Sequence, residues 1–154
     1  MNKIVERLKS RMLSILGLDF EIDFQDECFS GIATDLYLGS RPKVGQIEAL
    51  KKRGITHIVS CLNAEKYSEV AFLEKDFQTI FLPVRDGIRE DIASVLPSFF
   101  EFISKSKNSS PRTKVLVHCE AGVSRSATLI IALLMVRDHM VSAEPSSPNL
   151  YSRM

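Results

Sequence analysis

Apolar residues recur along this chain with two different spacings that alternate with each other. Short runs of apolar and β-branched residues predict strands at 36–38, 55–62, 79–84 and 114–117. Apolar residues at helical spacing predict helices at 45–52, 92–106 and 127–140. Strands that alternate with helices indicate an α/β fold with a mainly parallel central sheet flanked by helices.

Residues 1–26 form a separate predicted segment. In 1–18, basic residues lie between apolar side chains at helical spacing, which are Ile4, Leu8, Met12, Ile15 and Leu16. Such a helix could bind a membrane surface or an acidic partner. Packing against the chain's own domain is favoured, because one short helix with few basic residues is a weak anchor. Residues 19–27 are acidic, without a basic residue, and predict a solvated connector.

Composition limits the class of protein. The 154 residues are 45% hydrophobic and 25% charged, which is ordinary for one soluble globular domain, expected here at 27–140. The net charge of +1 gives no reason to expect a nucleic-acid partner. No secretory leader is visible, and no apolar run reaches the roughly 20 residues of a membrane-spanning helix. Three widely spaced cysteines favour a reducing compartment, so we expect a cytoplasmic or nuclear protein.

The most informative segment joins the last predicted strand to the last predicted helix. It has the sequence His-Cys-Glu-Ala-Gly-Val-Ser-Arg-Ser, at 118–126. Amides of a strand-to-helix turn and the positive end of the helix dipole stabilise an anion. A cysteine there ionises more easily than a free thiol, whose pKa is about 8.5. The planar fork of Arg125 can hold two oxygens of a phosphate. The segment therefore predicts a site that handles phosphate.

This segment resembles the signature of the cysteine-dependent protein tyrosine phosphatase superfamily, His-Cys-x-x-Gly-x-x-Arg-Ser. Residues 121–128, together with Leu-Tyr-Leu-Gly-Ser at 36–40 and Gly-Ile-Thr-His-Ile at 54–58, resemble its dual-specificity branch. The similarity runs from about Ile32 to Val136. It implies a protein phosphatase that needs no cofactor and acts on phosphorylated proteins, with protein kinases among the expected partners. The chain shows no kinase-docking domain and so looks similar to the atypical members of the branch.

The resemblance also implies a role for each residue of the segment. Cys119 is the expected nucleophile, which forms a phosphocysteine intermediate. Ser126 is expected to donate a hydrogen bond to the sulfur, and His118 to orient the loop rather than transfer protons. Arg125 is expected to bind the phosphate oxygens together with backbone amides of the loop, which belong to Glu120, Ala121, Gly122, Val123 and Ser124.

A general acid is needed because the oxygen of the substrate leaves as an alkoxide unless it is protonated. The resemblance places this acid on an upstream loop, and Asp86 in Val-Arg-Asp-Gly fits that place. Asp91 is the competing candidate. The residues that follow Asp91 predict the first turn of a helix, where the helix dipole stabilises a carboxylate. We therefore expect Asp86 to be the acid.

The remaining candidate residues have structural interpretations. Cys28 and Cys61 are expected to be small core residues. Because Cys61 ends a predicted strand, a redox disulfide with an oxidised Cys119 is an alternative. His57 is expected to be a packed or surface residue. The sequence has no closely spaced group of cysteines and histidines that predicts a metal site.

The substrate class follows from what the resemblance implies about the site. The chain has no tryptophan, whereas tyrosine-specific members usually carry the acid in a Trp-Pro-Asp loop and are longer. This favours a shallower site that accepts phosphotyrosine, phosphoserine and phosphothreonine. Glu120 disfavours highly anionic inositides, since a basic residue there would suit them better. Two alternatives remain: a phosphatase acting on a lipid, glucan or RNA end, and a poorly active module that binds phosphoproteins.

The C-terminal end departs from the family pattern. Members of the branch normally continue past the helix at 127–140 with further helices, whereas 141–154 predicts a short irregular tail in which Pro145 and Pro148 oppose a long helix. Ser147-Pro148-Asn149 resembles a tripeptide that the family carries nearer its end. We therefore expect a shortened member that lacks the last helices. Its exposed apolar surface would lower its stability or require a partner.

Overall fold

A central sheet forms the middle layer of the computed structural model, which describes residues 29–87, 89–122 and 124–142. The strands have the order β1-β2-β5-β3-β4. They are β1 (Phe29–Ala33), β2 (Leu36–Gly39), β3 (His57–Leu62), β4 (Gln78–Pro83) and β5 (Val115–His118). Strand β1 is antiparallel to β2, and all other neighbouring pairs are parallel. The predicted α/β fold with a mainly parallel sheet is confirmed.

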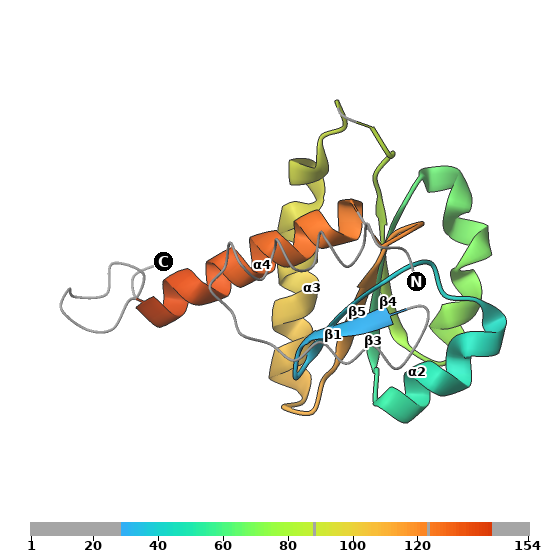
Figure 1. Ribbon diagram of the computed structural model, residues 1–154, viewed down its shortest axis with the longest axis horizontal. Coiled ribbons are helices and arrows are strands. Elements are labelled where there is room, and N and C mark those ends of the chain that lie inside the picture. Colours follow the sequence, from blue (N-terminus) through green and yellow to red (C-terminus); the bar gives the residue numbers. More distant parts are fainter. Residues whose placement is uncertain (1–28, 88, 123, 143–154) are drawn as a thin grey trace.

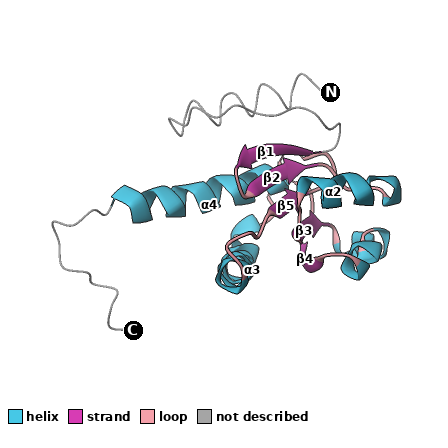
Figure 2. Ribbon diagram, turned by 90° about the horizontal axis from the view of Figure 1, so that it is seen from below, coloured by secondary structure: helices cyan, strands magenta, loops and turns pink. Residues whose placement is uncertain are grey.

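Helices cover both faces of this sheet (Figure 1). One face carries α3 (Leu96–Ser109) and α4 (Arg125–Ser142). The other carries α2 (Ile47–Arg53) together with short 3₁₀ helices. Within the described residues the 3₁₀ helices are η1 (Val44–Gln46), η2 (Ala64–Glu69), η3 (Ala71–Lys75) and η4 (Ile92–Val95), of which η4 packs on the side of α3 and α4. Figure 2 shows the sheet between these two layers, with α4 reaching beyond it.

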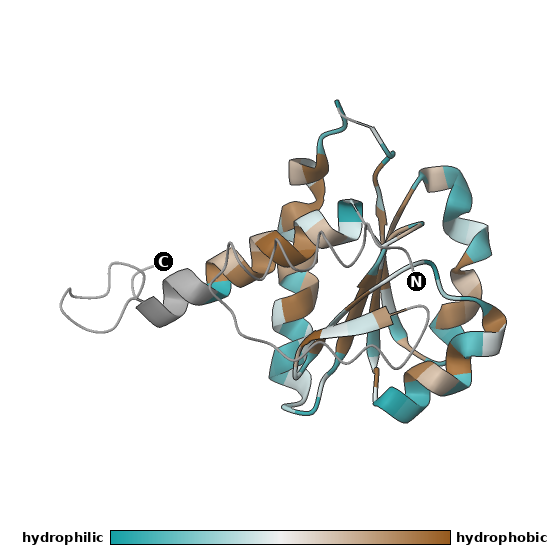
Figure 3. Cartoon of the chain, in the orientation of Figure 1, coloured by the Kyte–Doolittle hydropathy of each residue, from teal (hydrophilic) through white to brown (hydrophobic). Residues whose placement is uncertain are grey.

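The two faces of the sheet bury two separate apolar clusters. In β3, Val59 belongs to the cluster under α3 and α4, whereas Ile58 belongs to the cluster on the α2 side. In β5, Val117 belongs to the cluster under α3 and α4, and Leu116 belongs to the cluster on the α2 side. Successive side chains of a strand point to opposite faces, so a strand covered on both sides is apolar at every position. The hydropathy colouring shows brown along much of the central strands and over parts of α3 and α4 (Figure 3).

Several element boundaries differ from the prediction. Helix α3 runs from Leu96 to Ser109, whereas the predicted helix covered 92–106, and α4 runs from Arg125 to Ser142 rather than from 127 to 140. In the last turns of α3, two serine hydroxyls bond to carbonyls of the preceding turn: Ser106 donates to the Ile103 carbonyl at 2.8 Å, and Ser109 donates to the Lys105 carbonyl at 2.9 Å.

Strand β1 and the 3₁₀ segments at 64–75 were not predicted at all. Strand β1 contains polar and small residues and a register shift between Gly31 and Ala33, so its apolar pattern is weak. The predicted helix at 1–18, the acidic connector, Cys28 and the tail after 142 lie outside the described residues.

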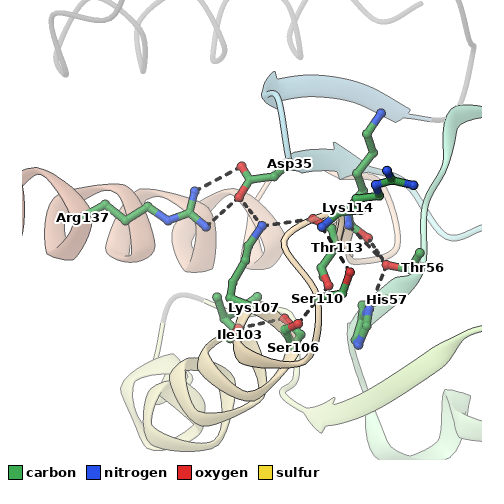
Figure 4. Close-up of polar contacts among 11 residues, drawn as sticks. Asp35, Thr56, His57, Ile103, Ser106, Lys107, Ser110, Thr113, Lys114 and Arg137 are labelled. Atoms are coloured by element: carbon green, nitrogen blue, oxygen red, sulfur yellow. Dashed lines mark hydrogen bonds and ion pairs between the residues drawn. The ribbon is translucent and has the colours of Figure 1, made fainter.

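A charged cluster ties the helices together at the end of the sheet where β5 begins (Figure 4). Asp35, in the turn between β1 and β2, accepts hydrogen bonds from Lys107 of α3 and from both terminal nitrogens of Arg137 of α4. Burial alone would raise the pKa of Asp35, but Lys107 and Arg137 together hold it below its ordinary value. The backbone N–H of Val115 donates to the Asp35 carbonyl at 2.9 Å, so the cluster also fixes the start of β5.

Helix α4 also presents apolar side chains to solvent. Met135 is 50% exposed and Val136 is 43% exposed. Among the described residues, no helix combines the length and the apolar character that crossing a membrane requires.

Candidate active site

The carboxyl ends of the four parallel strands meet at one edge of the sheet, where α/β folds place their ligand sites. Strand β5 lies between β2 and β3, and the chain leaves it at His118 and enters α4 at Arg125. Residues 119–124, called the phosphate loop below, therefore lie between two neighbouring strand ends and before the positive end of a long helix. The connections that follow β2, β3 and β4 surround this loop.

Cys119 lies at the bottom of the site and is 2% exposed. The hydroxyl of Ser126, in the first turn of α4, donates a hydrogen bond to the Cys119 sulfur at 3.2 Å. Cys61 is fully buried in the cluster under α3 and α4, so the prediction that it is a core residue is confirmed. Burial raises the pKa of Cys61 to about 12. The charge of Cys119 adds to this increase, and the charge of Arg125 opposes it. Its thiol therefore stays protonated at neutral pH.

Arg125 is held from one side. Its Nη1 donates to the Val84 carbonyl at 2.9 Å and to Oδ1 of Asn63 at 3.2 Å. Its Nε is buried and has no hydrogen-bond partner among the described residues. An unpaired buried donor costs about 1–3 kcal/mol, so a phosphate oxygen that accepts from Nε would be stabilised there. Asn63 was not predicted as a site residue; its only signal in the sequence is a polar side chain directly after a buried strand.

The two candidate acids lie in different environments. Asp86, on the loop after β4, is exposed, and its Oδ2 lies 3.6 Å from Nη2 of Arg125. Asp91 instead accepts a hydrogen bond from the Ser94 N–H at 3.3 Å and caps the turn that leads into α3. The structure thus places Asp86 beside the predicted phosphate-binding arginine and Asp91 at a helix start.

His118 is fully buried behind the phosphate loop. Its Nε2 lies 2.7 Å from the Ser60 hydroxyl, and its Nδ1 lies 3.3 Å from the Cys119 carbonyl. Burial lowers the pKa of His118 to about 4, so the ring is neutral at pH 7. Ser60 was not predicted; it reaches the ring because β3 and β5 pair with Ser60 opposite His118.

The phosphate loop packs closely against the end of β2. Gly122 has φ +70°, and a Cβ at this position would lie 2.6 Å from the Gly39 carbonyl and 2.9 Å from the Ser40 nitrogen. Only glycine satisfies both the backbone conformation and the space. Glu120, Ala121 and Ser124 are exposed on the loop, and Val123 lies outside the described residues.

The surroundings of the site carry charges of both signs. A hollow of about 270 Å³ lies beside the loop that bears Asp86. It is lined by residues of two connections, which are Ala64, Glu65, Pro83, Arg85 and Glu90. No group of three or more metal-ligating side chains is found among the residues that the structure describes.

A family model described as "Dual specificity phosphatase, catalytic domain" matches residues 36–147. The chain belongs to this family. An Arabidopsis thaliana relative described as "Protein-tyrosine-phosphatase MKP1" is 33% identical over 147 residues, which are 89% of this chain and 18% of that protein. The Mus musculus protein "Dual specificity protein phosphatase 19" is 40% identical over 100 residues, or 65% of this chain and 43% of that protein.

A solved structure is also similar to this chain. The crystal structure of the human "tyrosine phosphatase-like serine/threonine/tyrosine-interacting protein" has a TM-score of 0.64 and 30% identity, covering 73% of this chain and 80% of that chain. The chain spans less than half the length of the two curated relatives named above. The family resemblance read from the motifs is confirmed.

Proposed function

We propose that this chain is the catalytic domain of a dual-specificity protein phosphatase, which hydrolyses phosphotyrosine, phosphoserine and phosphothreonine. One observation carries the proposal. The buried Cys119 sulfur accepts a hydrogen bond from Ser126 at the start of α4, and Arg125 from the same turn presents an unpaired Nε donor. A nucleophile, a group that stabilises it as a leaving group and a phosphate-binding donor thus occupy one site.

The first step transfers the phosphoryl group to the enzyme. The Cys119 thiolate attacks phosphorus, a sulfur–phosphorus bond forms, and the bond between phosphorus and the substrate oxygen breaks. Asp86 gives its proton to that oxygen, so that an alcohol or phenol leaves. Arg125 and the loop amides bind the equatorial oxygens, whose charge they stabilise most strongly in the transition state.

The second step releases phosphate. The Asp86 carboxylate takes a proton from a water molecule, whose oxygen attacks phosphorus while the sulfur–phosphorus bond breaks. The Ser126 hydroxyl, 3.2 Å from the sulfur, stabilises the departing thiolate. His118 is buried and neutral, and its contacts with Ser60 and the Cys119 carbonyl suit it to hold the loop in place.

Phosphorylated proteins are the proposed substrates, and protein kinases are proposed among them. The exposed Glu120 at the mouth supports this choice over highly anionic lipid headgroups, because it offers no positive charge to their further phosphates. We also propose a cytoplasmic or nuclear location, on the basis of the few and widely spaced cysteines.

A module that binds phosphoproteins without hydrolysing them is the second candidate. One solved relative is described as phosphatase-like and interacting rather than as a phosphatase. The contacts of Cys119, Ser126 and Arg125, with Asp86 close by, favour hydrolysis for this chain.

Hydrolysis of an aryl phosphate and of matched phosphotyrosine and phosphothreonine peptides tests the proposal. Cys119→Ser is expected to abolish turnover, and Asp86→Asn to lower kcat on the peptides about 10²–10⁴-fold. Asp91→Asn is the matched control, because it removes a nearby carboxylate while asparagine still caps a helix. Turnover that survives Cys119→Ser would refute the mechanism. A parent chain that binds the peptides without hydrolysing them would establish the binding module instead.

A further inference from the structure

Arg41 holds Glu120, the second residue of the phosphate loop, through contacts with its backbone and its side chain. Arg41 is the second residue after β2, in the connection to α2. Its backbone N–H donates to the Glu120 carbonyl at 3.2 Å. Its Nε donates to Oε1 of Glu120 at 3.2 Å, and its Nη2 lies 3.1 Å from the same oxygen. One residue thus fixes the main chain and the carboxylate of the residue that follows the nucleophile.

A second carboxylate holds the guanidinium in this position. Nη1 of Arg41 donates to Glu69 of η2, and Lys66 lies 2.7 Å from the other carboxylate oxygen of Glu69. The hydrogen bond from Lys66, and next the charge of Arg41, keep the pKa of Glu69 below its ordinary value. The arginine side chain is 30% exposed, so the contacts restrain it although it borders solvent. Four charges of alternating sign therefore run from η2 to the mouth of the site.

The position of Glu120 explains why this restraint matters. Glu120 is next to Cys119 in the chain, and its side chain is 45% exposed at the mouth through which an anionic substrate must pass. An unpaired carboxylate there would repel a phosphate dianion and would disfavour the thiolate form of Cys119. The paired guanidinium cancels that charge at a distance of 3.1 Å. The residues just before Arg41 also contact the phosphate loop. Gly39 lies so close to Gly122 that a Cβ on Gly122 would have no room.

We propose that Arg41 is a positioning residue of the phosphate loop, which neutralises Glu120 and so keeps the mouth of the site open to phosphate. The proposal rests on the proposed phosphatase function. It assigns Arg41 no contact with the reacting atoms. Arg41 affects substrate binding through Glu120. The effect of replacing Arg41 should therefore depend on whether Glu120 is present, which would not hold if the two residues had separate structural roles.

A double-mutant cycle tests this coupling. The parent chain, Arg41→Gln, Glu120→Gln and the double variant are compared in aryl phosphate hydrolysis across pH and in calorimetric binding of inorganic phosphate. Arg41→Gln is expected to raise KM and the phosphate dissociation constant about three- to tenfold. It should also move the acid limb of kcat/KM to higher pH. In the Glu120→Gln background the same substitution is expected to change either constant by less than about twofold. Arg41→Lys, which keeps the charge without the fork, should fall between the parent and Arg41→Gln.

Lys51→Gln is the matched control, because it removes an ion pair of 2.8 Å with Asp76 at the opposite end of the sheet. It is expected to leave KM and the pH profile unchanged, whatever it does to the melting temperature. The proposal would be overturned if Arg41→Gln had equal effects in the parent and in Glu120→Gln, or if it did not shift the acid limb of kcat/KM. Arg41 would then have a purely structural role. A parent chain without Cys119-dependent turnover would refute the proposed function separately, and phosphate binding would still decide the role of Arg41.

Discussion

Acid should destabilise this protein through His118 before its carboxylates are protonated. Burial lowers the pKa of the His118 ring from an ordinary 6.5 to about 4. Between these two values the unfolded chain binds a proton that the folded chain does not. The contribution to stability is therefore complete above pH 6.5 and is lost as the pH falls from 6.5 towards 4.

The size of this loss follows from the two pKa values. Each pKa unit corresponds to about 1.4 kcal/mol, so the whole window is worth about 3 kcal/mol. At pH 4.5 the free energy of unfolding should be about 2.5 kcal/mol lower than at pH 8 from this group alone. This is a large fraction of the 5–15 kcal/mol typical of a domain.

Urea unfolding at several pH values between 8 and 5 measures this effect. As the pH falls, the free energy of unfolding of the parent should decrease with a slope approaching about 1.4 kcal/mol per pH unit. This contribution to the slope should be absent in His118→Asn. His57→Gln is the control for a second histidine, whose pKa burial also lowers. Because His118→Asn could fail to fold, NMR titration of the imidazole in the parent provides a second measurement. A His118 ring that titrates near pH 6.5 in the folded protein would refute the reasoning.

Gly122→Ala should lower the free energy of unfolding by about 3 kcal/mol and abolish turnover, because of its positive φ and its contact with β2. Gly45→Ala, where nothing lies within 4 Å of the added Cβ, is the control in the same urea assay. Asp35→Asn should cost about 1 kcal/mol at pH 7. Since the folded pKa of Asp35 is lowered, the difference from the parent should vanish as the pH falls through that pKa. Iodoacetamide should alkylate Cys119 well before Cys61, whose pKa is raised to about 12, as peptide mass mapping can show; equal rates would contradict this.

Much of the candidate site could be predicted because it is local in the sequence. The proposed nucleophile, the arginine and the serine that donates to sulfur lie within 119–126, where a strand end, a tight turn and a helix start follow one another. Asp86 could be placed from the family pattern, and Asp91 could be set aside because the residues after it begin a helical turn. Strand β1 was not predicted because its apolar pattern is weak. Its backbone pairing with β2 holds it in the sheet.

Partners that lie far apart in the sequence could not be predicted. Asn63 holds Arg125 from 62 residues away, Ser60 meets His118 from 58 residues away, and Arg41 meets Glu120 from 79 residues away. Apolar periodicity reports which face of an element is buried, but it carries no information on which strands become neighbours.

The sequence by itself determined most of the helices and strands, the phosphate loop and the kind of chemistry that a cysteine and an arginine can perform there. The order of the strands was decided only in the tertiary structure. Strand β5 lies between β2 and β3, where both of its apolar faces are covered. That single placement brings the ends of β2 and β3 to the two sides of the phosphate loop. It thereby sets the charge at the mouth of the site, the neutral state of His118 and the orientation of Arg125.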